Sequence, residues 1–365
     1  MTNPTLCCIS DCHLGYLHRL KKQRQVDYEN AFKEALEKAL AEKPGLIIFG
    51  GDLFHHSRPD AASMKILITT LMDAAASTQI VLCVGNHEID GNIKTAYVPL
   101  FSDLHENIHV LTAENPHLKL ALDGKTIAIH GFHFLRNKEQ AEETLKKITS
   151  EVGTGSDVNI LCMHQAVEGA LAPFEISLKA LKEAAPKYDL ILLGHVHKHQ
   201  KIDMPKPAYY IGSTERVSFN ESENKTGFLI FRDYKFGSPE QVPVSAPIMR
   251  RIKQDLGKKT PAEINSLIKG LIEENRDAKC LQITLDAEIA GDYFDVKYDW
   301  EAEYPDYTVL SVSITPKIRE EAVTLESMRL DRGVIEEYFE KTGLAGRTDL
   351  KDLCIAAYEK YSGNS

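Results

Sequence analysis

The chain has 365 residues, enough for one large domain and a smaller one, and its 43% hydrophobic and 26% charged residues are typical of a soluble globular protein. No apolar run approaches the roughly 18 residues that a membrane span requires, and no signal peptide is visible, so we expect a cytoplasmic protein. The net charge of −10 argues mildly against a nucleic-acid partner, although two divalent ions would add four positive charges locally. The seven cysteines form no Cys-x-x-Cys pair, which favours buried thiols over zinc ligands or disulfides.

Short apolar runs alternate with helical patterns along the first two-thirds of the chain. The runs that predict strands lie at 5–9, 46–49, 80–84, 125–129, 159–163, 189–193, 208–211 and 227–231, with one more near His109. Apolar residues at three-to-four spacing, beginning at Val26, predict a long helix that ends before 44, and further helices are expected at 61–76, 139–150 and 178–184. This alternation predicts an α/β layered domain.

The composition changes near Val242. Pro243, Pro247 and the basic run at 250–253 suggest a linker. A helix at 261–274 and strands near 281–285 and 309–314 then predict a small α+β unit, and two amphipathic helices are expected at 334–341 and 350–361. We therefore expect three segments, at 1–242, 243–325 and 326–365.

Five of the expected strands are followed by residues of the types that commonly bind metal ions. These are Asp11 and His13; Asp52; Asn86 and His87; His164; and His195 and His197. Open α/β sheets place such strand ends at one edge, where ligands bind. Carboxylate, amide and imidazole groups without sulfur suit Mn²⁺, Fe²⁺ or Zn²⁺, and two ions about 3.5–4 Å apart are the usual clamp for attack on phosphorus. Any one of these residues alone is more often a turn, cap or core residue, but together they predict a two-metal site bridged by Asp52.

The motifs Asp-x-His, Gly-Gly-Asp, Gly-Asn-His-Glu, a single His and Gly-His-x-His, in this order, resemble those of the calcineurin-like metallophosphoesterase superfamily. The resemblance implies a sandwich of two mixed sheets flanked by helices, in which a metal-bound hydroxide attacks a phosphoester. It also implies that one ion is bound by Asp11, His13, Asp52 and His197, and the other by Asp52, Asn86, His164 and His195. In this pattern His87 is not a ligand but protonates or stabilises the leaving oxygen.

Finer motifs at 11–15, 51–59 and 210–216 resemble the SbcD branch, which includes the archaeal and eukaryotic meiotic-recombination nuclease. This implies a DNA nuclease of double-strand break repair with two Mn²⁺ ions per subunit, for which Mg²⁺, Fe²⁺ or Zn²⁺ could substitute. It would be a three-prime to five-prime exonuclease on duplexes and an endonuclease on single strands. His55 would help to orient the DNA strand at the site.

The same resemblance implies roles for the rest of the chain. Segment 243–325 would be a DNA-binding capping domain, and 326–365 would dock on the coiled coil of an SbcC-type ATPase. A homodimer is expected, with 61–76 and 89–105 as its candidate surface. Basic clusters at 19–24, 198–201 and 250–253 would contact DNA phosphates or belong to the solvated surface.

One departure and two alternatives remain. Glu88 stands where this branch usually has Asp, and because it is not an expected ligand we predict altered surroundings of the metals without loss of activity. The first alternative is a small-molecule phosphodiesterase or phosphatase with the same metals, which the net charge favours. The second is a non-catalytic scaffold that recruits the ATPase. His55, the motif at 212–216 and the two C-terminal segments favour the nuclease.

Overall fold

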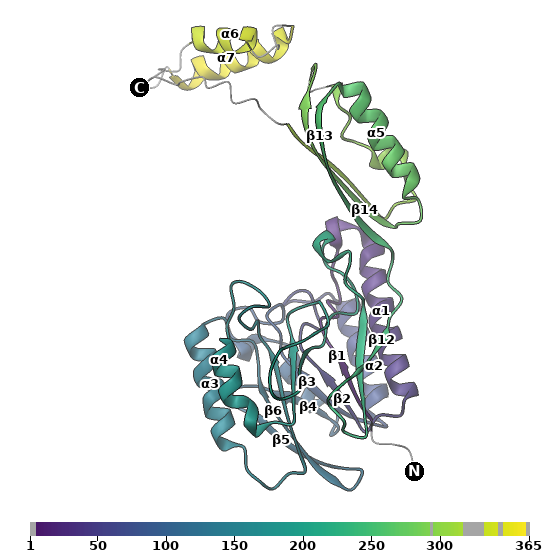
Figure 1. Cartoon of the computed structure of the whole chain (residues 1–365), viewed down its shortest axis with the longest axis vertical. Helices are drawn as coiled ribbons and strands as arrows, with labels where there is room; N and C mark the ends of the chain where they lie inside the picture. Colours follow the sequence, from purple (N-terminus) through teal and green to yellow (C-terminus); the bar gives the residue numbers. More distant parts are fainter. Residues whose placement is uncertain (1–4, 293–294, 317–331, 342–345, 363–365) are drawn as a thin grey trace. The chain divides into compact units, whose positions relative to one another are not determined.

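The computed structural model describes residues 5–292, 295–316, 332–341 and 346–362. They belong to two compact units, Met1–Pro247 and Ile248–Ser365, and we describe each by itself (Figure 1). Within the described residues, no helix has both the length and the apolar character needed to cross a membrane. The predicted boundary at 325/326 lies outside the described residues.

The first sheet of the larger unit is built on four parallel strands. They are β1 (Thr5–Ile9), β2 (Leu46–Phe49), β3 (Gln79–Cys83) and β4 (Ile108–Leu111), and β11 (Gly227–Arg232) and β12 (Glu240–Pro243) continue the sheet antiparallel beyond β1. Every residue of β1 and β2 is buried, as expected when both faces of a strand are covered. Helices α1 (Lys22–Ala41) and α2 (Ala61–Ala75) pack on the outer face through residues such as Phe32 and Leu71.

The second sheet has a matching plan. Its parallel strands are β6 (Lys125–Phe132), β7 (Val158–His164), β8 (Leu190–Gly194) and β10 (Ala208–Tyr210), with β5 (His117–Leu122) and β9 (Gln200–Lys201) antiparallel at its two edges. Helices α3 (Lys138–Glu151) and α4 (Leu178–Ala184) cover the outer face through Leu145, Ile148 and Leu181.

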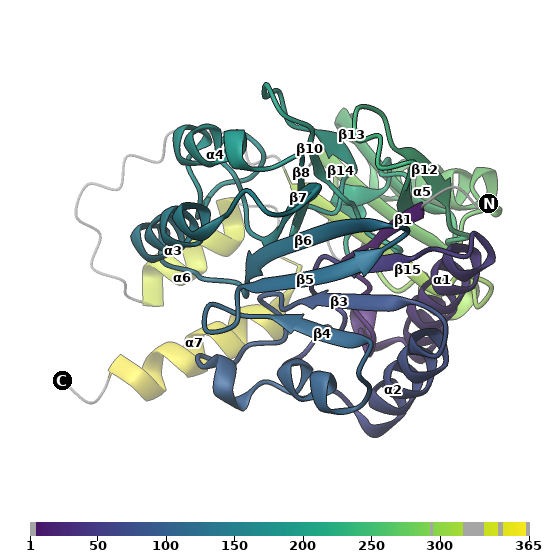
Figure 2. The ribbon, with the colours of Figure 1, turned by 90° about the horizontal axis from the view of Figure 1, so that it is seen from below.

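The inner faces of the two sheets pack against each other (Figure 2). Cys8, Ile48 and Val81 of the first sheet share one core with Ile160 and Leu192 of the second. The predicted sandwich of two mixed sheets flanked by helices is therefore confirmed. All seven cysteines are free and six are buried, so the interpretation of the cysteines as buried thiols is also confirmed.

Two local predictions were wrong. Val26 is 42% exposed, and the buried face of α1 begins instead with Arg24 and Tyr28, which are both 0% exposed. The run at 250–253 is not a linker, because it lies inside strand β13 (Met249–Lys259). There Arg250 forms an ion pair with Asp277, which offsets its charge.

The smaller unit contains a three-stranded parallel sheet in the order β13, β14 (Cys280–Ile289), β15 (Val309–Pro316). Helix α5 (Pro261–Glu274) connects β13 to β14, and a capping box between Thr260 and Glu263 fixes its start. Ile264 and Ile268 of α5 pack on Leu281 and Ile283 of the sheet. The unit also contains helices α6 (Arg332–Lys341) and α7 (Thr348–Ser362), at the positions expected from the sequence.

Candidate metal centre

The loops that follow β1, β2, β3, β7 and β8 bring polar side chains from both sheets to one place. His164 Nε2 lies 3.3 Å from Asp52 Oδ2 and 3.1 Å from Asn86 Oδ1. His197 Nε2 lies 3.5 Å from Asp11 Oδ1 and 3.1 Å from His13 Nε2. Asp11, His13 and His164 are 0% exposed, so this is a cluster of buried carboxylates and imidazoles.

In the part of the chain that the structure describes, two of the three groups of possible ligands in this cluster consist only of residues predicted as ligands, and the third is His13, His55 and His87. Asp11, His13 and His197 form what we call group 1, and Asp52, His164 and His195 form group 2; in each, the ligand atoms lie within 4.8 Å of one another. Asn86 contacts group 2 through His164, and Asp52 also lies 3.9 Å from His13 of group 1. The structure thus brings together all seven residues that the sequence predicted as ligands.

Four of these residues have left-handed backbone conformations, which non-glycine residues seldom adopt. The φ angles are 51° at Asp11, 49° at His13, 50° at Asp52 and 82° at His195. Such conformations cost on the order of 1 kcal/mol or more each and persist where the surroundings impose them. Here the N–H of Asp11 donates to Gly51 O and that of His13 to Asp52 O, both at 3.0 Å, so the two loops hold each other.

Gly85 has a steric role at the centre. A Cβ at this position would overlap the carboxylate and the backbone nitrogen of Asp52. The side chain of Asp52 is also held by the N–H of His87, which donates to Oδ1 at 2.9 Å. The glycine therefore permits the close approach of the β3 loop to the residue shared by the two groups.

Hydrogen bonds at Nδ1 fix the orientation of two ligand rings. His164 Nδ1 donates to Gly50 O at 2.8 Å, and His197 Nδ1 donates to Glu221 Oε2 at 3.1 Å. A carbonyl or carboxylate oxygen can only accept, so Nε2 of each ring is the atom turned toward the neighbouring ligands. There it meets carboxylate, amide and imidazole acceptors, and such a convergence of electron pairs suits a bound cation. The donor set therefore fits the two-metal site typical of its motifs.

Burial and neighbouring charges shift the pKa values of His164, Asp52 and Asp11 in different directions. Burial disfavours the imidazolium of His164, but the carboxylates of Asp52 and Asp11 outweigh it and raise its pKa to about 10. Burial likewise opposes the charge on Asp52, yet His164 and His13 hold its pKa well below the usual range. Burial raises the pKa of Asp11, with His164 and His197 acting in the opposite direction. Among the described residues, the ion pairs formed by Asp11 and Asp52 are with histidines.

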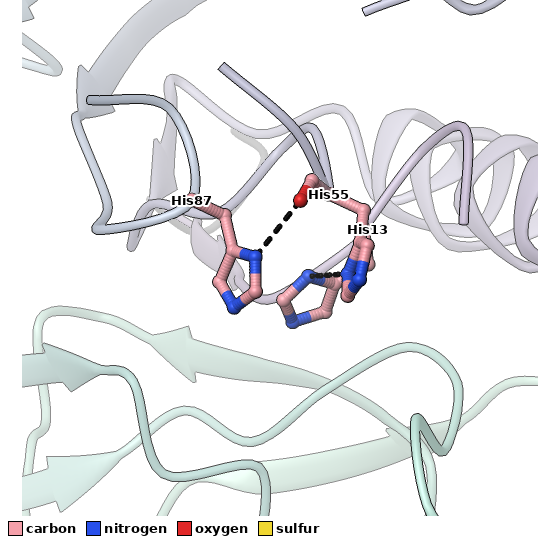
Figure 3. Close-up of side chains that lie close together, drawn as sticks. All are labelled: His13, His55 and His87. Atoms are coloured by element: carbon pink, nitrogen blue, oxygen red, sulfur yellow. Dashed lines mark hydrogen bonds between the residues drawn. The ribbon is translucent and has the colours of Figure 1, made fainter. Parts of the chain in front are cut away.

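A third set of histidines borders group 1 (Figure 3). His87 Nδ1 donates to the backbone oxygen of His55 at 2.8 Å, and His55 Nδ1 lies 3.1 Å from His13 Nδ1. The His55 ring also stacks on Tyr16 with a centroid distance of 3.8 Å. The two residues predicted to be catalytic, His87 and His55, therefore lie directly beside the predicted ligands.

Glu88 links the loop after β2 to the loop after β3 through hydrogen bonds to three backbone N–H groups. Its carboxylate accepts hydrogen bonds from the N–H groups of Leu53 at 2.7 Å, Phe54 at 3.2 Å and Gly85 at 2.7 Å. Burial and the charge of Asp52 raise its pKa to about 7. Glu88 belongs to neither ligand group, so it supports the loops that follow β2 and β3.

Sequence reasoning missed Glu221 and Tyr16, and it misjudged Arg24, one member of a basic cluster. No local motif marks Glu221, since its partner His197 lies 24 positions earlier. Tyr16 follows the Asp-x-His-x-Gly motif directly, and that proximity was the available signal. In the cluster at 19–24, Arg24 is fully buried and cannot contact DNA, whereas Lys198 and Lys201 of the second cluster are exposed.

Comparison with known proteins gives consistent similarities. Residues 4–199 match the family model described as calcineurin-like phosphoesterase. Two curated relatives, both named DNA double-strand break repair protein Mre11, come from Methanopyrus kandleri and Archaeoglobus fulgidus. The first is 26% identical over 238 residues, covering 60% of this chain and 50% of the relative. The second is 26% identical over 234 residues, covering 59% and 51%.

The chain thus spans about half the length of these relatives. Among solved structures, a protein of Thermus thermophilus aligns with 67% of this chain and 100% of its own, with a TM-score of 0.47 and 12% identity.

Proposed function

Because the chain belongs to the calcineurin-like phosphoesterase family, we propose that it is a Mn²⁺-dependent DNA nuclease that processes double-strand breaks. The main support is the convergence of groups 1 and 2, together with Asn86, at five strand ends, which matches a site for phosphoester hydrolysis. The choice of DNA as substrate is supported by the names of the Mre11 relatives and by the motifs at 51–59 and 210–216. The proposed activities are three-prime to five-prime cleavage of duplex ends and endonucleolytic cleavage of single strands.

Each residue of the centre has a proposed role. Group 1 together with Asp52 would hold one ion, and group 2 together with Asn86 would hold the other. Asp52 lies between the groups, at 3.3 Å from His164 and 3.9 Å from His13, as a bridging carboxylate must. When bound, the ions would supply a nucleophile from water and neutralise the charge that develops on the phosphate.

His87 is the proposed acid. Its bond to the His55 carbonyl occupies Nδ1 and fixes the ring, which leaves Nε2 to give a proton to the leaving oxygen. The His55 ring, placed between His13 and Tyr16, is the proposed contact for the DNA strand at the edge of the centre. Lys198 and Lys201, which follow β8 and are exposed, would pair with backbone phosphates.

The smaller unit would supply the other functions of such a nuclease. We propose that its sheet and α5 form the capping domain, and that α6 and α7 dock on the coiled coil of an SbcC-type ATPase. Tyr338 on α6 is 59% exposed and Leu353 on α7 is 66% exposed, and such apolar side chains on a helix pair suit a helical partner. The protein would act as a homodimer.

The test is digestion of an end-labelled DNA duplex with Mn²⁺ by wild-type protein, a His87→Ala variant and a His56→Ala control. His56 is an exposed histidine on the loop that follows β2 and belongs to neither ligand group, so its loss should leave the activity within about twofold. Loss of a proton donor predicts a decrease in rate of about 10²- to 10⁴-fold for His87→Ala.

Robust DNA degradation by pure His87→Ala protein would contradict the role of His87. A para-nitrophenyl phosphodiester serves as the second substrate. Turnover of this small ester by wild-type protein while DNA stays intact would reject the nuclease and support a small-molecule phosphodiesterase.

A further inference from the structure

Glu221 reaches the metal centre from a loop that contributes none of the predicted ligands. The loop follows β10, and its last turn, Phe219–Glu221, places the carboxylate 3.1 Å from His197 Nδ1. The side chains of His197 and Glu221 are only 15% and 17% exposed, so this contact is largely shielded from water. The same carboxylate accepts from Val217 N at 3.0 Å and Ser218 Oγ at 3.1 Å, which fixes its own position.

The two ligand groups differ in how their histidines are held. In group 2, His164 donates to the backbone oxygen of Gly50, which no substitution of a side chain removes. In group 1, His197 donates to the side chain of Glu221. A carboxylate partner fixes the tautomer of a ligand histidine and increases its basicity, and loss of such a partner typically lowers metal affinity about 10- to 100-fold.

The loop itself is anchored to helix α1. Tyr28 OH donates to Arg216 O at 2.6 Å, and Arg24 Nη2 donates to the same oxygen at 3.1 Å. Arg24 also pairs with Glu215 at 3.4 Å, and both of these side chains are 0% exposed. The segment that ends at Glu221 therefore starts from a rigid point, so the carboxylate is in place before any ion binds.

We propose that Glu221 is a positioning residue for group 1. It holds the His197 ring with Nε2 toward Asp11 and His13, and so determines the affinity of group 1 for a divalent ion without affecting group 2. The inference concerns ion binding and does not require that the substrate is DNA.

The experiment measures Mn²⁺ binding to the full chain by isothermal titration calorimetry, for wild type, Glu221→Ala, Glu221→Gln and Glu223→Gln. Glu223 is exposed on the same turn, so its replacement changes the net charge equally and serves as the matched control. We expect Glu221→Ala to weaken one of two binding events about 10- to 100-fold and leave the other unchanged. Glu221→Gln, which keeps an acceptor oxygen but loses the charge, should fall between Glu221→Ala and wild type.

The His197 tautomer provides a second measurement that does not depend on bound metal. In ¹⁵N-labelled protein without metal, the Nδ1 signal of His197 should shift toward that of an unprotonated nitrogen in Glu221→Ala, while the His164 signals stay unchanged. If Glu221→Ala bound Mn²⁺ in two events that both had the wild-type affinity, the proposal would be overturned. Equal weakening of both events would also overturn it, because the effect would then not be specific to group 1.

Discussion

At the scale of single residues, neighbouring groups decide whether a buried histidine is charged. His130 on β6 is 4% exposed, and burial lowers its pKa to about 4. Its ring contacts His117, at 2.8 Å between the two Nδ1 atoms, and Asn159, so within the described residues it has no carboxylate contact to offset the burial. His164 is also buried but faces Asp52, and its pKa lies at about 10. Proximity to a carboxylate therefore distinguishes the histidine of the centre from a core histidine.

His130 makes a pH-dependent contribution to stability. Between its usual pKa of 6.5 and its folded pKa of about 4, the unfolded chain binds a proton that the folded protein does not. Stability should therefore fall as the pH falls through this window, by up to ~1.4 kcal/mol per pH unit. The test is urea unfolding of metal-free wild type and His130→Gln at pH 7 and at pH 5. The free energy of unfolding by which wild type exceeds His130→Gln should be smaller at pH 5 than at pH 7. An equal stability difference at both pH values would contradict a pH-dependent contribution of His130.

At the scale of elements, α1 covers the first sheet and also holds the loop that follows β10. Its inner face contains the apolar residues Ala31, Phe32 and Ala35, but its first turn buries Arg24. The guanidinium pairs with Glu215 of the loop after β10 and with Asp27 on α1 itself. A buried charge of this kind requires a partner, so α1 and the loop that contains Glu221 depend on each other.

Removal of Arg24 should be strongly destabilising. Arg24→Ala leaves the Glu215 carboxylate buried without its ion-pair partner, which typically costs about 3–5 kcal/mol of unfolding free energy. The control is Lys22→Ala, because Lys22 is exposed on the same turn and its loss should change stability by less than ~0.5 kcal/mol. Urea denaturation followed by circular dichroism gives both values. A loss below about 1 kcal/mol for Arg24→Ala would show that the pair is not needed.

At the scale of the whole molecule, one apolar surface supports the proposed homodimer. Tyr97, Leu100 and Leu104, on and beside the short helix Val98–Asp103, are 44%, 57% and 37% exposed. They lie within the candidate surface 89–105 predicted from the sequence. Val98 and Phe101 of the same segment are buried and fix it on the core. Exposed apolar side chains grouped in this way suit contact with a second copy of the chain.

The homodimer is tested by Leu100→Asp. A charge at the centre of this surface should convert a dimer to a monomer, measured as molar mass by light scattering during gel filtration. Leu171→Asp is the matched control, because Leu171 is an equally apolar residue, 46% exposed, on a different loop. A wild-type protein that is monomeric at tens of micromolar, or a Leu100→Asp protein that stays dimeric, would remove the support for this surface.

The sandwich of two sheets and the assignment of the seven ligands were predicted from the resemblance of short motifs to those of the superfamily. The α/β layering and the polar strand ends were predicted from the residues alone, because each group of ligands follows an apolar strand. The helices at 61–76, 139–150, 178–184 and 261–274 were predictable for the same reason, since their apolar spacing is local.

The roles of residues whose partners are distant in the chain could not be predicted from local pattern. Arg24 belonged to a basic cluster by sequence, but Glu215, 191 positions later, draws it into the core. Glu221 has no motif, and its contact with His197 exists because the loop after β10 returns to the centre. Strand β5 was missed because its residues alternate between exposed and half-buried at a sheet edge and give no buried apolar run. Local periodicity reports which face of an element is buried, whereas the pairing of distant polar groups is set only when the two sheets and their loops pack together.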